Sequence, residues 1–247
     1  MNIAIISLGC PKNQVDADVF CHALLKEGHQ TVADLSEADV VIVNTCGFIE
    51  SAKSEAIENI LMACEYKQQN PDLKVIVTGC LAERYKQQII SEMPEVDAVV
   101  GIGSNAALPA IVARLCAAGA GQLESYGPKR DMPLGGARVI STPRHYAYLK
   151  IAEGCNNRCH YCAIPLIRGP LRSRPLADCV AEARYLHQWF SAAAAAVSIQ
   201  FFFRVSVRLG TGQCIPSTES GYLVFGEAQR LCNGRISVAG LAELFYS

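Results

Sequence analysis

Short apolar runs alternate with helical patterns through the first 118 residues of this chain. The expected buried strands cover residues 2–8, 40–43, 75–77 and 98–100, and the expected helices cover residues 14–27, 49–61, 82–91 and 106–117. In the helical segments, apolar residues recur every three or four positions, as on one face of an amphipathic helix. Strands that alternate with helices favour a parallel sheet covered by helices on both faces. We therefore predict a parallel three-layer α/β domain over residues 1–118.

A cysteine follows three of these expected strands, each time next to a glycine. The three pairs are Gly9-Cys10, Cys46-Gly47 and Gly79-Cys80. In open α/β sheets, ligands bind outside the carboxyl ends of the strands. We therefore expect Cys10, Cys46 and Cys80 to meet at one edge as a three-thiolate metal site. A buried cysteine also packs as a small hydrophobic residue, and this alternative suits Cys21, Cys64 and Cys116, which lie within helical patterns.

Three further cysteines, Cys155, Cys159 and Cys162, stand within eight residues in the spacing C-x3-C-x2-C. Thiolates this close in sequence can reach one metal centre without help from the fold. Iron–sulfur clusters are usually held by four thiolates. On a four-iron cluster, three thiolates leave one iron without a protein ligand. That iron can bind another ligand, as a catalytic metal site requires. The alternatives are a zinc site and a chance cluster, although zinc sites favour paired cysteines, or cysteine and histidine pairs, at wider separation.

The segment around this motif is basic, although the whole chain has a net charge of −1. Residues 144–174 hold Glu153 as their single acid, against six cations: Arg144, Lys150, Arg158, Arg168, Arg172 and Arg174. A basic collar around an anionic, thiolate-rich cluster would favour the anionic species and could attract an acidic partner. A solvated loop is the alternative interpretation of this charge.

Residues 3–186 resemble the methylthiotransferases of the radical S-adenosylmethionine (SAM) superfamily. The matching segments are residues 7–13, 43–49, 77–81 and 142–151, together with the cysteine loop through residue 165. The Leu-Gly-Cys-Pro-Lys-Asn run at residues 8–13 is similar to the RimO branch, which modifies an aspartate of ribosomal protein S twelve. The tRNA-modifying MiaB branch usually has a Gly-Cys-Gln-Met-Asn type of sequence at this place.

The resemblance implies two [4Fe-4S] clusters and SAM as cofactors. It assigns Cys155, Cys159 and Cys162 to the cluster that cleaves SAM, and the cysteines at positions 10, 46 and 80 to an auxiliary cluster that carries or donates sulfur. It also implies Tyr161 as an aromatic contact of SAM. The implied reaction adds a methylthio group to the β-carbon of an aspartate, with a second SAM as methyl donor and an electron donor as partner.

A second domain is expected to begin at residue 144. A strand at residues 146–151, the cysteine loop and a helix over residues 175–190 form one βα unit, as at the top of a TIM-like barrel. Residues 119–143 are rich in glycine and proline and are expected to form a linker. The family pattern stops after about residue 187. Residues 144–187 are therefore expected to form the start of a radical SAM domain. We expect an incomplete barrel that encloses SAM poorly.

The tail over residues 188–247 is expected to be a foreign reading frame or a degraded end. Residues 151–247 contain no lysine, whereas residues 1–150 contain eight. A possible strand covers residues 198–209, and a lineage-specific domain is the alternative interpretation. If the DNA carries no family-like continuation in any other frame, the frameshift hypothesis is wrong.

The sequence thus predicts a RimO-like methylthiotransferase, shortened by truncation or frameshift. The alternatives are a tRNA adenosine methylthiotransferase, a non-catalytic iron–sulfur-binding fragment and a zinc-binding protein. Twelve cysteines without an export signal indicate reduced thiols in the cytoplasm. No apolar run reaches the roughly 18 residues of a transmembrane helix, so no membrane association is expected.

Overall fold

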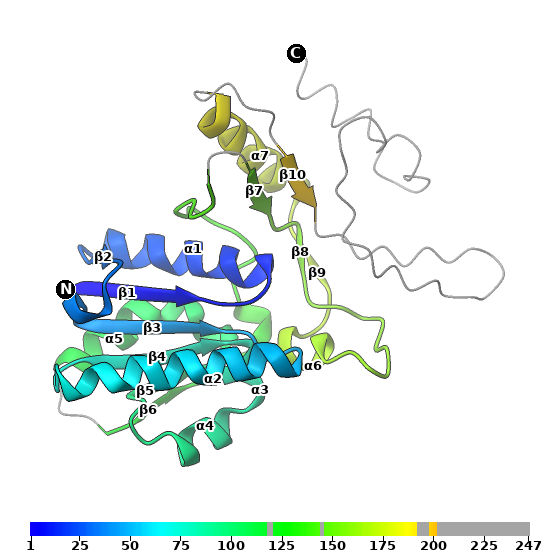
Figure 1. Ribbon diagram of the computed structural model, residues 1–247. Coiled ribbons are helices and arrows are strands. Elements are labelled where there is room, and N and C mark those ends of the chain that lie inside the picture. The colour runs from blue at the N-terminus through cyan, green and yellow to red at the C-terminus, as the bar shows by residue number, and fades with distance from the viewer. Residues whose placement is uncertain (118–120, 144–145, 192–197, 202–247) are drawn as a thin grey trace.

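The computed structural model describes residues 1–117, 121–143, 146–191 and 198–201. Its larger part is a six-stranded sheet in which all neighbouring strands run parallel (Figure 1). The strands are β1 (Asn2–Ser7), β2 (Gln30–Val32), β3 (Val40–Thr45), β4 (Lys74–Gly79), β5 (Ala98–Val100) and β6 (Leu123–Ser125). Their order across the sheet is β2-β1-β3-β4-β5-β6. This architecture confirms the predicted α/β class.

Helices cover both faces of the sheet and produce three layers (Figure 1). One face carries α1 (Pro11–Lys26) and α5 (Leu108–Ala117), and the other carries α2 (Glu50–Glu65), α3 (Cys80–Arg84) and α4 (Lys86–Glu92). Successive residues of a strand point to opposite faces. Strand β3 therefore gives Val40 and Ile42 to one core and Val41 and Val43 to the other. Within the described ranges, no helix combines the length and hydrophobicity that crossing a membrane requires.

The structure differs from the sequence prediction at the edges of the sheet and around two helices. The edge strands β2 and β6 contain three residues each, all exposed or partly exposed, so they lack an apolar pattern. Strand β6 lies in residues 119–143, which thus extend the sheet as well as linking its parts. The helix expected at residues 82–91 is broken at Tyr85, where φ is −120° and ψ is 29°. A short 3-10 helix, η3 (Ile102–Ala107), precedes α5.

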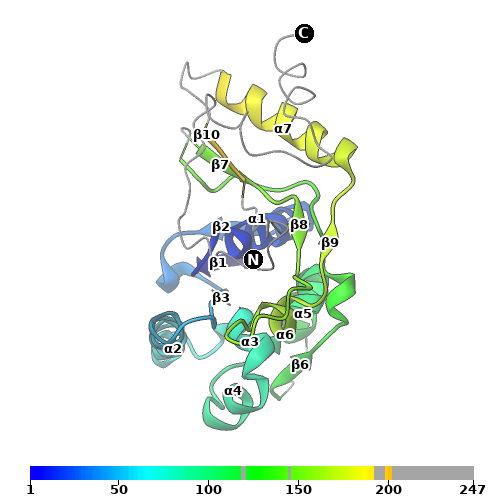
Figure 2. The same ribbon diagram turned by 90° about the vertical axis from the view of Figure 1, so that its right-hand side faces the viewer.

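The second part of the structure is a βαβ unit (Figures 1 and 2). It comprises β7 (Tyr146–Leu149), α7 (Leu176–Ser191) and β10 (Ser198–Phe201), and β10 pairs with β7 in parallel. These elements match the predicted βα unit and the first residues of the possible strand at 198–209. Positions 202–247 of the predicted tail lie outside the described residues.

The cysteine loop is inserted between β7 and α7. The antiparallel pair β8 (Ala152–Glu153) and β9 (Arg172–Ser173) closes the base of this insertion, which also contains α6 (Ile164–Arg168). Helix α6 lies beside the carboxyl ends of the sheet strands (Figure 1). There Ile167 packs in one buried cluster with Cys80, Ile102 and Met132. The insertion is therefore anchored directly on the edge where the strand-end cysteines lie.

Buried ion pairs join the two parts on the side of α1. Arg138 donates from Nη1 to Asp18 of α1 at 2.7 Å and from Nε to Glu182 of α7 at 2.8 Å. It also donates to the carbonyl of Tyr148 in β7. Burial raises the pKa of Asp18, and the hydrogen bonds from Ser141 and Arg138 oppose this shift only in part. One arginine therefore links the first helix of the sheet domain to both a strand and a helix of the βαβ unit.

Two glycines with positive φ provide a test of how tightly the strand ends are packed. Gly79 has a φ of 95°, and a Cβ there would lie 2.4 Å from the carbonyl oxygen of Thr45. Gly28 has a φ of 85°, and its Cβ would meet nothing within 4 Å. We expect Gly28→Ala to cost about 1–2 kcal/mol of unfolding free energy from backbone strain alone. We expect Gly79→Ala to cost about 2–5 kcal/mol, because overpacking adds to that strain.

Urea unfolding followed by far-ultraviolet circular dichroism measures both costs. Gly28→Ala is the matched control, since it changes the same residue type at a similar φ in open space. Equal losses in the two variants would show that strand β4 does not approach β3 as closely as the structure has it.

Candidate metal centre

The three strand-end cysteines follow strands that are neighbours in the sheet. Cys10 follows β1 and caps α1, Cys46 follows β3, and Cys80 is the first residue of α3 after β4. Adjacent strands lie about 4.8 Å apart, so three neighbouring strand ends span roughly 10 Å. The order of the sheet also reverses between β1 and β3, where α/β sheets bind ligands. The topology therefore brings this cysteine set to one place.

Glycines allow the segments that carry these cysteines to touch. A Cβ on Gly9, which has a φ of 89°, would lie 2.4 Å from Cβ of Cys46 and 2.9 Å from its Sγ. A Cβ on Gly47 would lie 2.8 Å from Cα of Leu81 and 3.3 Å from the carbonyl carbon of Cys80. Any larger residue at either position would separate these loops. The glycine beside each cysteine thus serves close approach, which the sequence pattern alone did not explain.

Asn13 holds the same strand ends from within α1. Its Nδ2 donates to the carbonyls of Leu8 at 2.7 Å, Asn44 at 3.2 Å and Thr45 at 3.3 Å. In return, Nδ2 of Asn44 donates to the carbonyl of Asn13 at 2.8 Å. These bonds satisfy backbone carbonyls at the point where β1 and β3 end, and they fix the loops that contain Cys10 and Cys46.

The thiols of this set lie at the boundary between the core and the surface. Cys80 and Cys46 are 5% and 8% exposed, whereas Cys10 is exposed. Burial raises the pKa of the Cys80 thiol to about 11; Arg168 opposes this shift, and Cys10 and Cys46 add to it. Cys10 and Cys46 thus lie close enough to Cys80 to affect the pKa of its thiol. A coordinating metal removes the thiol proton outright.

The donor chemistry of this set fits an iron–sulfur cluster. Cysteine thiolates are the usual ligands of such clusters. In the described part of the chain, no three or more His, Cys, Asp or Glu side chains are arranged around a single metal ion. A single ion such as zinc requires sulfurs about 2.3 Å from one point. A four-iron cluster is wider, because its thiolates bind different iron atoms.

The second cysteine set lies in the loop between β8 and α6. The backbone N–H of Cys155 donates to the carbonyl of Gly169 at 3.1 Å, and that of Cys162 donates to the carbonyl of Cys159 at 2.9 Å. Gly154 permits the first contact, since a Cβ there would lie 2.1 Å from the carbonyl oxygen of Pro170. All three cysteines are partly exposed. The structure thus places them in one loop, and a turn joins the last two.

Tyr161 lies within that turn, and its side chain is 70% exposed. Its predicted contact with SAM stays a prediction, as do the roles of the six cysteines as iron ligands.

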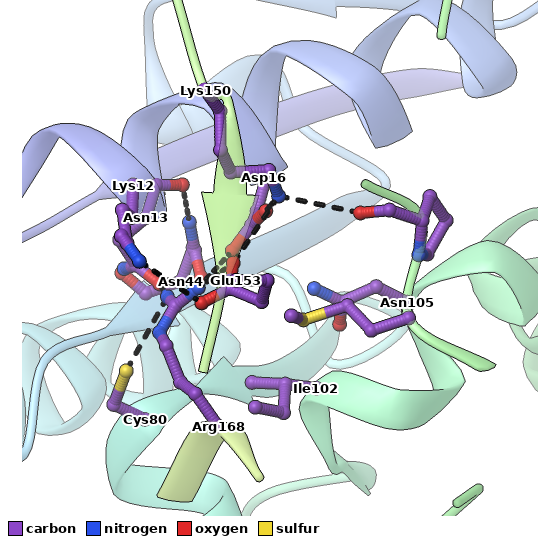
Figure 3. A network of polar contacts seen from close by, with 12 residues as sticks. Lys12, Asn13, Asp16, Asn44, Cys80, Ile102, Asn105, Lys150, Glu153 and Arg168 are labelled. Atoms are coloured by element: carbon purple, nitrogen blue, oxygen red, sulfur yellow. Dashed lines mark hydrogen bonds and ion pairs between the residues drawn. The ribbon is translucent and has the colours of Figure 1, made fainter. Parts of the chain in front are cut away.

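A buried network of charged side chains lies beside Cys80 (Figure 3). Nη1 of Arg168 donates to Asp16 Oδ2 and to Glu153 Oε2, both at 2.9 Å. Nζ of Lys150 donates to Asp16 Oδ1 at 2.5 Å and lies 3.4 Å from Glu153 Oε2. Each of these four residues is at most 6% exposed. Lys12 completes this buried charge network from its edge, with Nζ 3.5 Å from Glu153 Oε1.

This network contacts Cys80 of the first set and the backbone next to Cys155 of the second. Nη2 of Arg168 lies 3.3 Å from Asn13 Oδ1 and donates to Sγ of Cys80 at 3.5 Å. At the other side, Oε1 of Glu153 accepts a hydrogen bond from the backbone of Gly154 at 3.1 Å. Gly154 directly precedes Cys155, so one carboxylate fixes the start of the cysteine loop.

The pKa shifts of Glu153 and Arg168 favour the charged form of both side chains. Burial alone would raise the pKa of Glu153, but Arg168, Lys150 and Lys12 together lower it to about 2. Burial also opposes the charge of Arg168, but Cys80, Asp16 and Glu153 raise its pKa above the ordinary arginine value. Mutual pairing therefore compensates the cost of removing these charges from water.

The sequence analysis noted the basic collar but not the network. Lys150 and Arg168 are buried and face carboxylates, so at these positions the segment is not a solvated loop. The side chain of Arg174 is 6% exposed and pairs with Glu182. Arg144 lies outside the described residues. Two features of the sequence could have indicated the network. They are the single acid among six cations in residues 144–174 and the two aspartates, Asp16 and Asp18, on the buried face of α1.

The structure joins a parallel α/β domain with cysteines at three strand ends to a βαβ unit that carries C-x3-C-x2-C, as the resemblance to methylthiotransferases predicts. Residues 2–101 match the family described as "Uncharacterized protein family UPF0004". Three proteins named "Ribosomal protein uS12 methylthiotransferase RimO" are similar to this chain over about three quarters of its length. These similarities confirm the predicted resemblance to the RimO branch.

The three relatives come from Acetivibrio thermocellus, Sulfurihydrogenibium sp. and Clostridioides difficile. The first is 46% identical over 200 residues, which cover 74% of this chain and 42% of the relative. The second is 47% identical over 186 residues, which cover 75% of this chain and 39% of the relative. The third is 46% identical over 191 residues, which cover 75% of this chain and 42% of the relative. The chain thus spans about two fifths of the length of these relatives.

The buried charge network generates a stability prediction. Glu153→Gln removes a carboxylate that is 0% exposed and lies among three cations. We expect a loss of about 3–5 kcal/mol of unfolding free energy, because breaking a buried pair leaves charge uncompensated. Asp131→Asn is the control, since the Arg130–Asp131 pair is long, at 3.7 Å, and exposed. Its expected cost is about 0–1 kcal/mol.

Chemical denaturation at neutral pH compares the two variants. A cost for Glu153→Gln as small as that of the control would mean that the network does not hold the cysteine loop against the sheet domain.

Proposed function

We propose that this chain is a RimO-like methylthiotransferase that adds a methylthio group to the β-carbon of an aspartate of ribosomal protein uS12. The observation that carries the proposal is the convergence of Cys10, Cys46 and Cys80 at three neighbouring strand ends. The second cysteine set in the adjoining loop and the 46% identity to a relative named for this activity support it.

The two cysteine sets would hold the two clusters. Cys10, Cys46 and Cys80 fit an auxiliary cluster, and Cys155, Cys159 and Cys162 fit the cluster that carries SAM on its open iron. When bound, these groups supply the reductive cleavage of SAM and the sulfur that is transferred. Tyr161 lies between the last two cysteines of the loop and is assigned to SAM binding.

The residues around the cysteines would position these groups and exclude water. Glu153 holds the start of the cysteine loop through the backbone of Gly154. Arg168 joins the loop insertion to the sheet domain through Asp16 of α1. Correct placement of reacting groups alone can lower a barrier by several kcal/mol. The protein's main contribution is therefore the fixed relation of the two cysteine sets.

The partners in this proposal are the ribosomal protein substrate and an electron donor, and the reaction takes place in the cytoplasm. The ten cysteines in the described part of the chain are free thiols, as a reducing compartment requires. The rival functions are a tRNA adenosine methylthiotransferase and a non-catalytic iron–sulfur-binding fragment.

Anaerobic reconstitution with iron and sulfide tests the proposed cluster ligands. The unmodified chain is expected to bind about eight iron and eight sulfide, as two four-iron clusters require. Cys10→Ala and Cys155→Ala should each lose about half of both. Cys64→Ala is the matched control, because Cys64 is a partly buried thiol in α2, and it should retain the full content. Zinc without sulfide in the purified chain would contradict the assignment.

Product analysis then separates the rival functions. Formation of 5′-deoxyadenosine with methylthio-aspartate in uS12, detected by mass spectrometry, supports the proposal. Methylthiolated adenosine in tRNA supports the tRNA enzyme. Loaded clusters that do not cleave SAM support the non-catalytic fragment.

A further inference from the structure

Arg168 contacts Cys80, one of the strand-end cysteines, although it belongs to the other cysteine segment. It is the last residue of α6, six positions after Cys162, and it is 1% exposed. Its Nη2 donates to Sγ of Cys80 at 3.5 Å. We propose that Arg168 is a positioning residue for the auxiliary cluster: its hydrogen bond to the ligating sulfur of Cys80 raises the cluster's reduction potential. The inference rests on the proposed function, since it requires a cluster at Cys80.

The position of the guanidinium is fixed by contacts from several elements. Nη1 is held between Asp16 of α1 and Glu153 of β8, and Nη2 also lies against Oδ1 of Asn13. A planar guanidinium with contacts on both terminal nitrogens cannot rotate without breaking several charge-assisted hydrogen bonds. The contact with sulfur is therefore built into the fold.

The charge balance of the network indicates that an anion belongs beside it. Three cations, Lys12, Lys150 and Arg168, face two carboxylates, Asp16 and Glu153. The network thus has one net positive charge, with the partly exposed Lys12 at its edge, and buried charges are normally paired. The Sγ atom of Cys80 is the group that Arg168 contacts beyond the carboxylates and Asn13. A metal-bound thiolate at this position would complete the balance.

Hydrogen bonds and charge near cluster sulfurs act on the reduction potential in a known direction. The potential of an iron–sulfur cluster depends on its net charge, on hydrogen bonds to its sulfurs and on solvent exposure. Reduction adds negative charge, which a buried guanidinium stabilises more than water would. Loss of the N–H···S bond should therefore shift the potential to more negative values. A purely structural arginine would change stability without moving the potential.

Arg138 provides a matched control for Arg168. It is also a buried arginine, and it joins α1 to the later part of the chain through Asp18 and Glu182. Its hydrogen bonds go to these carboxylates and to the Tyr148 carbonyl, and none of the bonds described for it involves sulfur. Comparing the two positions separates the loss of a buried ion pair from the loss of the sulfur contact.

The experiment uses the full chain with Cys155, Cys159 and Cys162 replaced by alanine, so that the signal comes from the auxiliary cluster. The parent, Arg168→Lys and Arg138→Lys are reconstituted anaerobically with iron and sulfide. Metal content is counted, and the reduced cluster is followed by electron paramagnetic resonance through a redox titration. Lysine keeps the charge at position 168 but lacks the guanidinium fork.

For Arg168→Lys we expect the ratio of reduced to oxidised cluster at the parent midpoint to fall about tenfold, which is about 59 mV for one electron. For Arg138→Lys we expect a change of less than about twofold. A midpoint in Arg168→Lys that moves no further than the control overturns the inference and leaves the proposed function intact. A folded parent that binds no iron and sulfide overturns the proposed function and the inference with it.

A second pair of variants keeps the test decisive if Arg168→Lys does not fold. Arg168→Gln combined with Glu153→Gln removes one cation and one carboxylate together, so the network keeps its net charge. Arg138→Gln combined with Glu182→Gln is the equivalent change in the control pair. Circular dichroism verifies folding, and the same two midpoints decide the outcome.

Discussion

The close approach of three neighbouring strand ends is the constraint on which the site depends. Gly9 and Gly79 adopt left-handed backbone conformations there, and Gly47 packs against the backbone at Cys80 and Leu81. Because no side chain separates these loops, their cysteines can act on one ligand. The amide of Asn13 then supplies the hydrogen bonds that the carbonyls at the ends of β1 and β3 require. The sheet topology determines where the cysteines lie, and the glycines allow the loops that carry them to approach closely.

Cluster binding at these cysteines, as proposed above, would create an electrostatic requirement that the sheet domain does not meet by itself. Asp16 and Lys12 lie on α1, whereas Lys150, Glu153 and Arg168 come from the second part of the chain. Unpaired, each of these groups would be costly to bury. These charged groups pair with one another only when the βαβ unit and its loop insertion pack against the carboxyl ends of the sheet strands. The same contacts thus assemble the fold and set the charge around Cys80.

The sequence predicted the strand-end cysteines but not the charge network, for a physical reason. Apolar runs identify parallel strands, and every parallel strand delivers its last residue to the same edge, so the convergence of Cys10, Cys46 and Cys80 follows from local patterns. In the sequence, Asp16 is 134 positions from Lys150 and 152 positions from Arg168. No local pattern encodes such pairs. The edge strands β2 and β6 were missed because half-exposed strands of three residues lack an apolar run.

Helix α1 carries two buried aspartates, and their contrasting surroundings agree with the ligand role proposed for one of the two networks. Asp18 belongs to a balanced set, in which Arg138 and Arg174 face Asp18 and Glu182, and burial raises its pKa. The set around Asp16 has one cation more than it has carboxylates, and there the three cations overcome burial and lower the pKa of Glu153 to about 2. A balanced set needs nothing further, as expected for a structural contact between two parts of a chain. The unbalanced set lies against a cysteine sulfur, where an anionic metal–thiolate group would supply the missing charge.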